Sequence, residues 1–316
     1  MKALVTGATG FLGSRLVRRL IADGHTVSVL SRGTSSYAQI QDLLAQLTIY
    51  TVDEHPDGFR RAVAAAAPDV VFHLATYYAR DHRPDDLAAL LEANIAFPLR
   101  LIDAMAREGA RCLVNTGSAW QFYESATYRP VCLHSATKEA FSALVRYFVD
   151  IGAIDCITLM MHDSYGPGDP RRKIFTILSD RAGTSEPLQM SAGEQWIDLI
   201  HVNDAVGAYL VAADRLRESR RPAAHETYSI GGGNPLPLRQ VVETFLRHAG
   251  MSIPIQWGGR PYHEREVMQT WAGGERLPNW WPRIDIDTGL KELALGFAQP
   301  HTAVGQVSGI RPASGE

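Results

Sequence analysis

The chain opens with a short apolar run, a glycine-rich turn and an amphipathic segment, and this order restricts the possible folds more than any other feature. Residues 3–6 are Ala-Leu-Val-Thr, and glycines follow at positions 7, 10 and 13. Apolar residues then recur at helical spacing from position 12 to 21, and Gly24 ends the pattern. The sequence therefore predicts a strand, a tight turn and a helix.

The three glycines suit three different demands of a dinucleotide-binding turn. The first permits the turn, the second lets a pyrophosphate approach the backbone, and the third lets the helix pack on the strand. The helix start also offers free N–H groups and a positive dipole end to phosphates. A turn that binds nothing is the alternative, but its place between strand and helix favours a cofactor site. The predicted cofactor contacts in this turn are Gly7, Thr9, Gly10, Phe11, Leu12 and Gly13.

The end of the second apolar run indicates which cofactor is bound. Residues 26–30 predict a strand, and Ser31 and Arg32 follow it. A site for NAD usually has an acidic residue here to hold the ribose 2′-hydroxyl, whereas an Arg accommodates a 2′-phosphate. Ser31 can hydrogen-bond a phosphate oxygen and Arg32 can pair with its charge. We therefore expect NADP(H); the alternative is that Arg32 is a solvated loop residue.

Strand and helix patterns alternate through the first half of the chain. Apolar runs at 69–75, 111–116 and 155–161 predict strands. The helical patterns between and after them cover 59–67, 87–107 and 136–150. This alternation predicts an α/β fold with a Rossmann-type, doubly wound parallel sheet. Ligands gather at the carboxyl ends of such strands, so we expect Leu74, Ala75 and Thr76 to contact the cofactor.

The amino-acid composition changes after about residue 166, where Pro, Gly and Trp become more frequent. We expect an NADP-binding domain at 1–165, joined by a returning segment near 197–231. A smaller, irregular α/β substrate lobe is expected at 166–299. Residues 300–316 are rich in Gly, Ser and Pro and low in large apolar residues, so we expect a disordered tail.

Composition narrows the class of protein. The net charge of −3 gives no reason to expect nucleic acid or an anionic membrane as a partner, and no apolar run approaches a membrane span. The three cysteines, Cys112, Cys132 and Cys156, are odd in number and lack CxxC spacing. They predict reduced thiols in a cytoplasmic protein, and no metal site is expected.

Together these motifs resemble those of the extended short-chain dehydrogenase/reductase family. The stretches that carry the resemblance are 6–13, 71–75, 116–118 and 165–169, with Asn94 and Lys138. Three further stretches, 120–124, 136–141 and 265–268, resemble its nucleotide-sugar 4-ketoreductase branch, the CDP-abequose synthase type. The resemblance covers roughly residues 1–295. It implies a nucleotide-binding Rossmann domain, a C-terminal substrate lobe and hydride exchange at a sugar carbon.

The resemblance also implies a catalytic set of Ser or Thr, Tyr and Lys. Ser118 and Lys138 match the first and third members, but His134 stands where the Tyr is expected, four residues before the Lys. In the family pattern the Tyr donates a proton to the carbonyl oxygen, while the Lys holds the nicotinamide ribose. By its position in the family, Asp53 is expected near the adenine amino group.

Three hypotheses for His134 remain open. A neutral imidazole can donate one N–H, so His134 could replace the missing acid. Alternatively, the proton comes from water or from an acidic hydroxyl on the substrate. The third hypothesis is a redox-inactive protein that binds NADP without turnover.

The predicted substrate contacts lie at strand ends and in the second half of the chain. The resemblance would place an Arg at position 197, where this chain has Ile197, and Arg260 and Arg265 are the expected substitutes. The complete set of predicted substrate contacts is Tyr77, Tyr78, Trp120, His162, Arg260 and Arg265.

The sequence thus favours an NADPH-dependent carbonyl (keto) reductase similar to the nucleotide-linked 4-keto-6-deoxyhexose reductases, with a small-molecule ketone as its partner. The first alternative is a ketoreductase of an aromatic polyketide or antibiotic pathway, of the angucycline oxo-reductase type, whose substrate supplies its own proton. The second is an NADP-binding redox sensor.

A homodimer is expected through helices 87–107 and 136–150, since Phe141, Leu144, Val145, Phe148 and Val149 give the second helix more apolar surface than one sheet contact needs.

Overall fold

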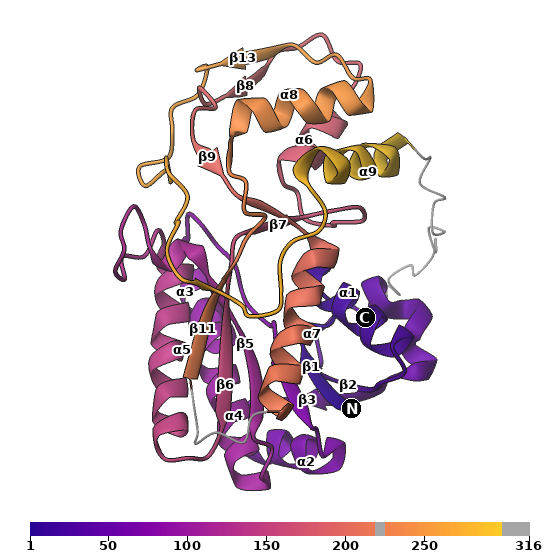
Figure 1. Ribbon diagram of the computed structural model, residues 1–316, viewed down its shortest axis with the longest axis vertical. Coiled ribbons are helices and arrows are strands. Elements are labelled where there is room, and N and C mark those ends of the chain that lie inside the picture. Colours follow the sequence, from indigo (N-terminus) through magenta and orange to yellow (C-terminus); the bar gives the residue numbers. More distant parts are fainter. Residues whose placement is uncertain (219–224, 299–316) are drawn as a thin grey trace, which may run out of the picture.

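The computed structural model describes residues 1–218 and 225–298, and within these its main element is an eight-stranded parallel sheet (Figure 1). The strand order is β14-β11-β6-β5-β4-β1-β2-β3. The strands are β1 (Lys2–Thr6), β2 (Thr26–Arg32), β3 (Thr48–Val52), β4 (Val70–His73), β5 (Cys112–Ser118), β6 (Asp155–Met161), β11 (His225–Ile230) and β14 (Glu275–Arg276). The predicted doubly wound α/β fold is confirmed. The tail expected at 300–316 lies outside the described residues.

Helices cover both faces of this sheet, because successive side chains of a strand point to opposite faces. On β1, Ala3 and Val5 face a core that includes α1 (Phe11–Ala22) and α7 (Val202–Glu218), whereas Leu4 faces the other core. The helices of the second face are α2 (Pro56–Ala66), α4 (Phe97–Glu108) and α5 (Leu133–Asp150). Two short 3-10 helices, η1 (Ala38–Gln46) and η3 (Ala119–Gln121), lie in the connections.

The helix expected at 87–107 is divided into three parts. It begins as α3 (Asp86–Leu91), passes through a π-helical turn η2 (Glu92–Ala96) and continues as α4. Pro98 lies in the first turn of α4 and has no N–H to donate to the preceding turn. Isolated π turns are frequent at functional sites, and this one carries the buried side chain of Asn94.

Most of the apolar residues that suggested a dimer surface on α5 are buried within the chain, and Leu144 is half-buried. Phe141, Val145, Phe148 and Val149 belong to the core between α5 and the sheet. The apolar side chains that α5 and its end expose are instead Tyr147 and Ile151. That argument for a homodimer is therefore corrected, because the helix turns those residues toward its own sheet.

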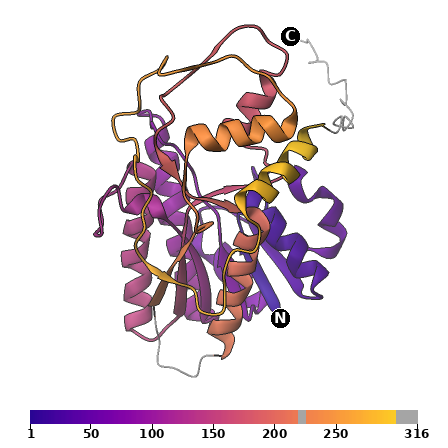
Figure 2. The ribbon, with the colours of Figure 1, turned by 45° about the horizontal axis from the view of Figure 1, so that its top comes forward.

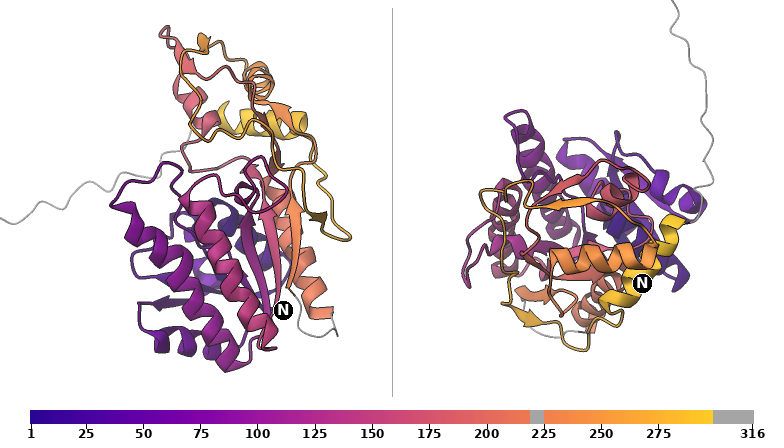
Figure 3. Two further views of the ribbon diagram at one scale, coloured as in Figure 1. Left: turned by 90° about the vertical axis from the view of Figure 1, so that its left-hand side faces the viewer. Right: turned by 90° about the horizontal axis from the view of Figure 1, so that it is seen from above.

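The smaller lobe lies over the carboxyl ends of the strands, as the side view of Figure 3 shows. Its helices are α6 (Ile174–Asp180), α8 (Leu238–Ala249) and α9 (Ile286–Ala298). Its short strands pair as β7 (Asp163–Tyr165) with β10 (Leu199–His201), β8 (Leu188–Met190) with β13 (Ile255–Trp257), and β9 (Trp196–Ile197) with β12 (Leu236–Pro237). Phe175, Val242, Phe245 and Leu293 contribute to a separate core between them.

The chain returns from the smaller lobe to the sheet twice. The first return is β11, which pairs with β6. The second, which the sequence did not predict, is β14 beside β11, followed by Leu277 and Trp280 in the core under α7. Before β14, residues 262–274, named the crossing segment here, descend from the smaller lobe to the edge of the sheet (Figure 2). This crossing segment and the loops after β4 and β5 surround the space between the lobes.

Candidate active site

Two adjoining cavities lie at the carboxyl ends of the strands. The first, of about 510 Å³, is lined by the glycine turn, the end of β2, the loop after β4, the end of β5 and the first turns of α5. The second, of about 410 Å³, lies between the sheet and the smaller lobe. Five residues line both cavities, so the two spaces adjoin; they are Trp120, His162, Asp163, Ser164 and Lys173.

The three glycines of the turn have different roles. The fold requires Gly7 and Gly13, whereas Gly10 leaves room for a ligand. Gly7 has a φ of +70°, and a Cβ there would lie 2.6 Å from the backbone N of Ala75. A Cβ on Gly13 would lie 2.0 Å from the Gly7 carbonyl oxygen. Gly10 differs, since its Cβ would meet only that oxygen, at 3.4 Å, and no side chain caps the helix that starts after it. Free N–H groups beside open space fit a cofactor pyrophosphate.

The end of β2 forms the next part of the first cavity. Ser31 is buried and its Oγ lies 2.7 Å from the Tyr37 hydroxyl, while Arg32 is exposed, and both line the cavity with Ser35. A hydroxyl beside an exposed guanidinium suits a ribose phosphate. Asp53 does not line either cavity; it is exposed, and its Oδ1 accepts the His55 N–H.

Ser118 and Lys138 reach the first cavity from β5 and α5. The Ser118 Oγ accepts the Trp120 N–H at 3.2 Å, so its own hydroxyl hydrogen can point to a ligand. Lys138 is buried, and desolvation lowers the pKa of its ammonium to about 8. The site therefore holds the ammonium group of Lys138 in a buried position where its charge is poorly solvated.

A chain of hydrogen bonds fixes the state of His134. The Asn94 amide is oriented by the Tyr77 backbone: Oδ1 accepts its N–H at 2.8 Å and Nδ2 donates to its C=O at 3.0 Å. The Thr76 hydroxyl donates to the same Oδ1 at 3.0 Å. The Thr76 oxygen, 3.1 Å from His134 Nε2, must therefore accept a hydrogen from that nitrogen. This places the imidazole proton on Nε2, and Nδ1 is buried without a partner in the part of the chain that the structure describes.

Burial, and secondarily the Lys138 charge, lowers the pKa of His134 to about 3. At neutral pH the ring is therefore uncharged, and its single proton is held by Thr76.

Aromatic residues line the path between the cavities. The Tyr78 ring lies edge-on to the His134 ring, with centroids 5.2 Å apart, and 6.0 Å from Trp120. All three line the first cavity. Tyr77 points elsewhere, because its hydroxyl donates to Asp86 at 2.7 Å, and it lines neither cavity.

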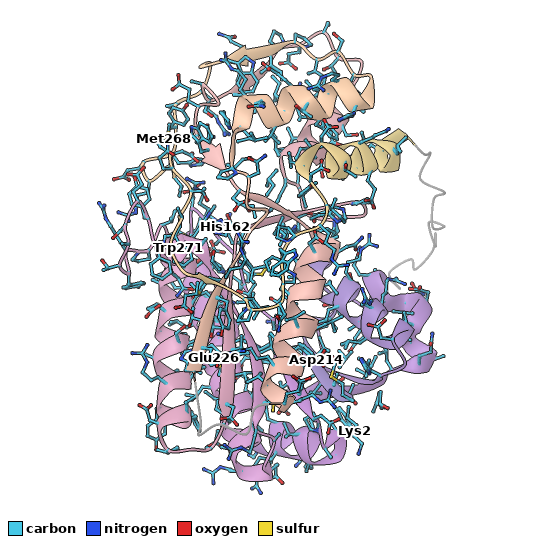
Figure 4. All side chains as sticks on the ribbon, in the orientation of Figure 1. Lys2, His162, Asp214, Glu226, Met268 and Trp271 are labelled. Carbon is cyan, nitrogen blue, oxygen red and sulfur yellow. The ribbon has the colours of Figure 1, made fainter. Side chains whose placement is uncertain are left out.

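His162 lies at the junction, with Trp271 stacked against it at 6.3 Å (Figure 4). Its Nδ1 is 3.2 Å from Thr270 Oγ1 and its Nε2 is 3.3 Å from Ser229 Oγ. Burial lowers the pKa of His162, although the Asp198 carboxylate, 3.9 Å away, opposes this. Because both ring nitrogens have hydrogen-bond partners, the His162 ring is fixed in position where the two cavities meet.

Of the two arginines predicted to contact substrate, only Arg260 lines a cavity, the second one. Arg265 donates to the carbonyl oxygens of Pro130 and Val131 and lies over the Tyr123 ring, 4.3 Å from its centroid. It ties the crossing segment to the loop after β5 and lines neither cavity.

The predicted site residues did not include Asp163 or Lys173. Their charged groups are 2.9 Å apart and the Lys173 charge holds the pKa of Asp163 below its ordinary value. Arg171 lies over the Phe11 ring of the glycine turn, 4.8 Å from its centroid. In the sequence, the run of basic residues at 171–173 was the signal that could have identified Lys173 as a site residue.

The first cavity brings together most of the predicted residues. Those that line it are Gly7, Thr9, Gly10, Phe11, Leu12, Gly13, Ser31, Arg32, Leu74, Ala75, Thr76, Tyr78, Ser118, Trp120, His134, Lys138 and His162. Asp53, Tyr77 and Arg265 lie outside both cavities, for the reasons given above.

A parallel sheet with a dinucleotide turn, and a Ser and a Lys beside it, defines an NAD(P)-dependent oxidoreductase-type enzyme. Residues 3–231 match the NAD dependent epimerase/dehydratase family, and the chain belongs to this family.

Among curated relatives, the CDP-abequose synthase of Salmonella muenchen is 25% identical over 295 residues, covering 92% of this chain and 96% of the relative. The UDP-glucose 4-epimerase of Mycolicibacterium smegmatis is 28% identical over 270 residues, covering 80% and 82%. Among solved structures, the UDP-glucose 4-epimerase of Thermus thermophilus in complex with NAD has a TM-score of 0.80 at 22% identity, covering 95% of this chain and 100% of that one. No helix within 1–218 and 225–298 has the length and apolar character needed to cross a membrane.

Proposed function

We propose that this protein is an NADPH-dependent carbonyl reductase. The observation that carries the proposal is the first cavity, which places Ser118 and Lys138 beside an open glycine turn. The corresponding domains are residues 1–165 with the returning segment near 197–231 for the cofactor, and 166–299 for the substrate.

The preference for NADPH rests on Ser31 and Arg32. Among the residues that the structure describes, no acidic side chain lines the cavity at the end of β2, where an NAD site holds the ribose hydroxyls. The exposed Arg32 can pair with a 2′-phosphate while Ser31 donates to it.

The residues of the chain bind and orient the reactants. The cofactor, when bound, supplies a hydride. Lys138 would hold the nicotinamide ribose and add positive charge near the developing alkoxide. Ser118 would donate a hydrogen bond to the carbonyl oxygen. His134 keeps Thr76 in place and holds no second proton at neutral pH.

A nucleotide-linked 4-keto-6-deoxyhexose is the first candidate substrate, since the chain is similar over most of its length to the CDP-abequose synthases of Salmonella muenchen and Yersinia pseudotuberculosis. Arg260 and Lys173 line the second cavity and could hold a diphosphate there.

An aromatic ketone, such as a polyketide, is the second candidate. One wall of the second cavity is the Phe122–Trp271 stack, with ring centroids 4.3 Å apart and planes 11° from parallel. A flat apolar ligand could extend this stack.

Two measurements test the proposal. NADPH consumption is followed with CDP- and dTDP-linked 4-keto-6-deoxyhexoses and with a panel of aromatic polyketide ketones. Thermal shifts with CDP, dTDP and the aromatic ketones, in the presence of NADP, then separate the two substrate classes. Tight NADPH binding with no consumption would reject the reductase and favour the sensor.

A further inference from the structure

His134 is poorly suited to donate a proton, although it occupies the expected acid position. Its Nε2–H is directed to Thr76, whose own hydrogen is directed to Asn94. Transfer of that proton to a ligand would leave the Thr76 oxygen without its donor. Because Nδ1 carries no proton and is buried, the ring has no second proton to give at neutral pH.

A phenol lies beside this ring. Tyr78 follows the clamped segment, since both backbone groups of Tyr77 bond to Asn94. Its ring is edge-on to His134 at 5.2 Å and lines the same cavity as Ser118 and Lys138. Among the described residues, its hydroxyl has no hydrogen-bond partner, and the residue is 55% exposed.

We propose that Tyr78 is the catalytic residue that gives the proton to the carbonyl oxygen. This inference rests on the proposed reductase function. The Asn94 side chain then has two roles. Through Thr76 it fixes the His134 ring, and through the Tyr77 backbone it positions Tyr78. His134 acts as a positioning residue, against whose ring the Tyr78 ring packs.

The proton balance is simple. As a hydride from the reduced nicotinamide bonds to the carbonyl carbon, the C=O π bond breaks and its electron pair moves to oxygen. The Tyr78 O–H bond breaks and a new O–H bond forms on that oxygen, so the ketone becomes an alcohol while the nicotinamide is oxidised. Water then reprotonates the phenolate, because the ring is open to solvent.

The surroundings of Tyr78 keep its phenol protonated at neutral pH. Partial burial and then the Asp163 carboxylate raise the pKa of its phenol above the ordinary value. The phenol is therefore a weaker acid than a free tyrosine, and it gives up its proton only to a strong base such as the alkoxide that forms as the hydride is added. A general acid contributes about 10²–10⁴-fold to a rate.

The test compares Tyr78→Phe with Tyr128→Phe, in which the phenol lost is exposed and outside both cavities. Tyr78→Phe should lower kcat by about 10²–10⁴-fold while the NADPH dissociation constant stays the same. Tyr128→Phe should leave both unchanged. His134→Phe should lose less kcat than Tyr78→Phe, and the reverse order would return the acid role to His134 and overturn the proposal.

A second readout does not need turnover. Nitrogen-15 NMR of the unliganded protein should show His134 protonated on Nε2 alone and without titration between pH 5 and 9. A proton on Nδ1, or a charged ring at pH 7, would overturn the inference, because His134 would then hold a free proton. Turnover retained by Tyr78→Phe would reject the role of Tyr78 alone, whereas no turnover by the unchanged protein would reject the reductase and Tyr78 together.

Discussion

Lys138 should lower the stability of the unliganded protein, and Lys138→Met should relieve this cost. Desolvation takes the pKa of the ammonium from 10.5 to about 8, so the folded state resists its charge. A pKa decrease of this size corresponds to about 3 kcal/mol. Methionine keeps an unbranched apolar side chain in the same space without the charge. We therefore expect Lys138→Met to raise the free energy of unfolding by up to about 3 kcal/mol at pH 7.

The pH dependence gives this prediction a sign. Below pH 8 Lys138 is charged in both folded and unfolded chains, so the full cost is present. Between about pH 8 and 10.5 the folded chain loses the proton first, and the cost fades. The advantage of the variant should therefore be largest at pH 7 and small near pH 10.5.

Urea titrations at pH 7 and 10 measure this difference. Lys291→Met is the matched control, because Lys291 is exposed on α9, and it should change stability by less than about 0.5 kcal/mol. A less stable Lys138→Met protein at pH 7, or a gain that does not change with pH, would refute the reasoning. The variant should also bind NADPH more weakly, since a residue kept at a cost to stability is expected to serve the ligand.

Three further predictions follow from the site and the surface. Arg32→Ala should weaken NADPH binding by about 1–3 kcal/mol and leave NADH unaffected in fluorescence titrations; equal affinity of the unchanged protein for both cofactors would contradict it. Gly10→Ala should fold normally yet bind NADPH poorly, because its Cβ would enter the ligand space, whereas Gly13→Ala should lose folded protein in circular dichroism because its Cβ would collide with the backbone. Because Tyr147 and Ile151 are both exposed and lie one helical turn apart at the end of α5, light scattering at micromolar concentration should give the mass of a homodimer, and a monomer mass would reject the dimer.

The sheet and the first cavity could be predicted because their signals are local. Strands β1, β2, β4, β5 and β6 are apolar runs that end at or just before a polar or glycine residue, and parallel strands carry those ends to one edge. The sequence thereby predicted that Ser31, Thr76 and Ser118 would lie near the glycine turn, and all three line one cavity.

The remaining features depend on contacts between distant residues. Strand β14 contains only Glu275 and Arg276, too short for any periodic pattern, and it exists because β11 offers an edge. Arg265 lies outside the cavities because two carbonyl groups of another loop accept its hydrogens. The proton position on His134 depends on Asn94, forty residues earlier in the chain. None of these partners is visible from spacing alone.

The central claim is that this site transfers a hydride from NADPH to a ketone. The most direct measurement uses NADPH with deuterium at the transferable C4 position, followed by mass spectrometry and NMR of the product of a CDP-linked 4-keto-6-deoxyhexose or an aromatic ketone. The account predicts one deuterium on the new carbinol carbon, matched by equal formation of NADP⁺. Bound but unconsumed NADPH with every ketone, or an alcohol without deuterium, would contradict it.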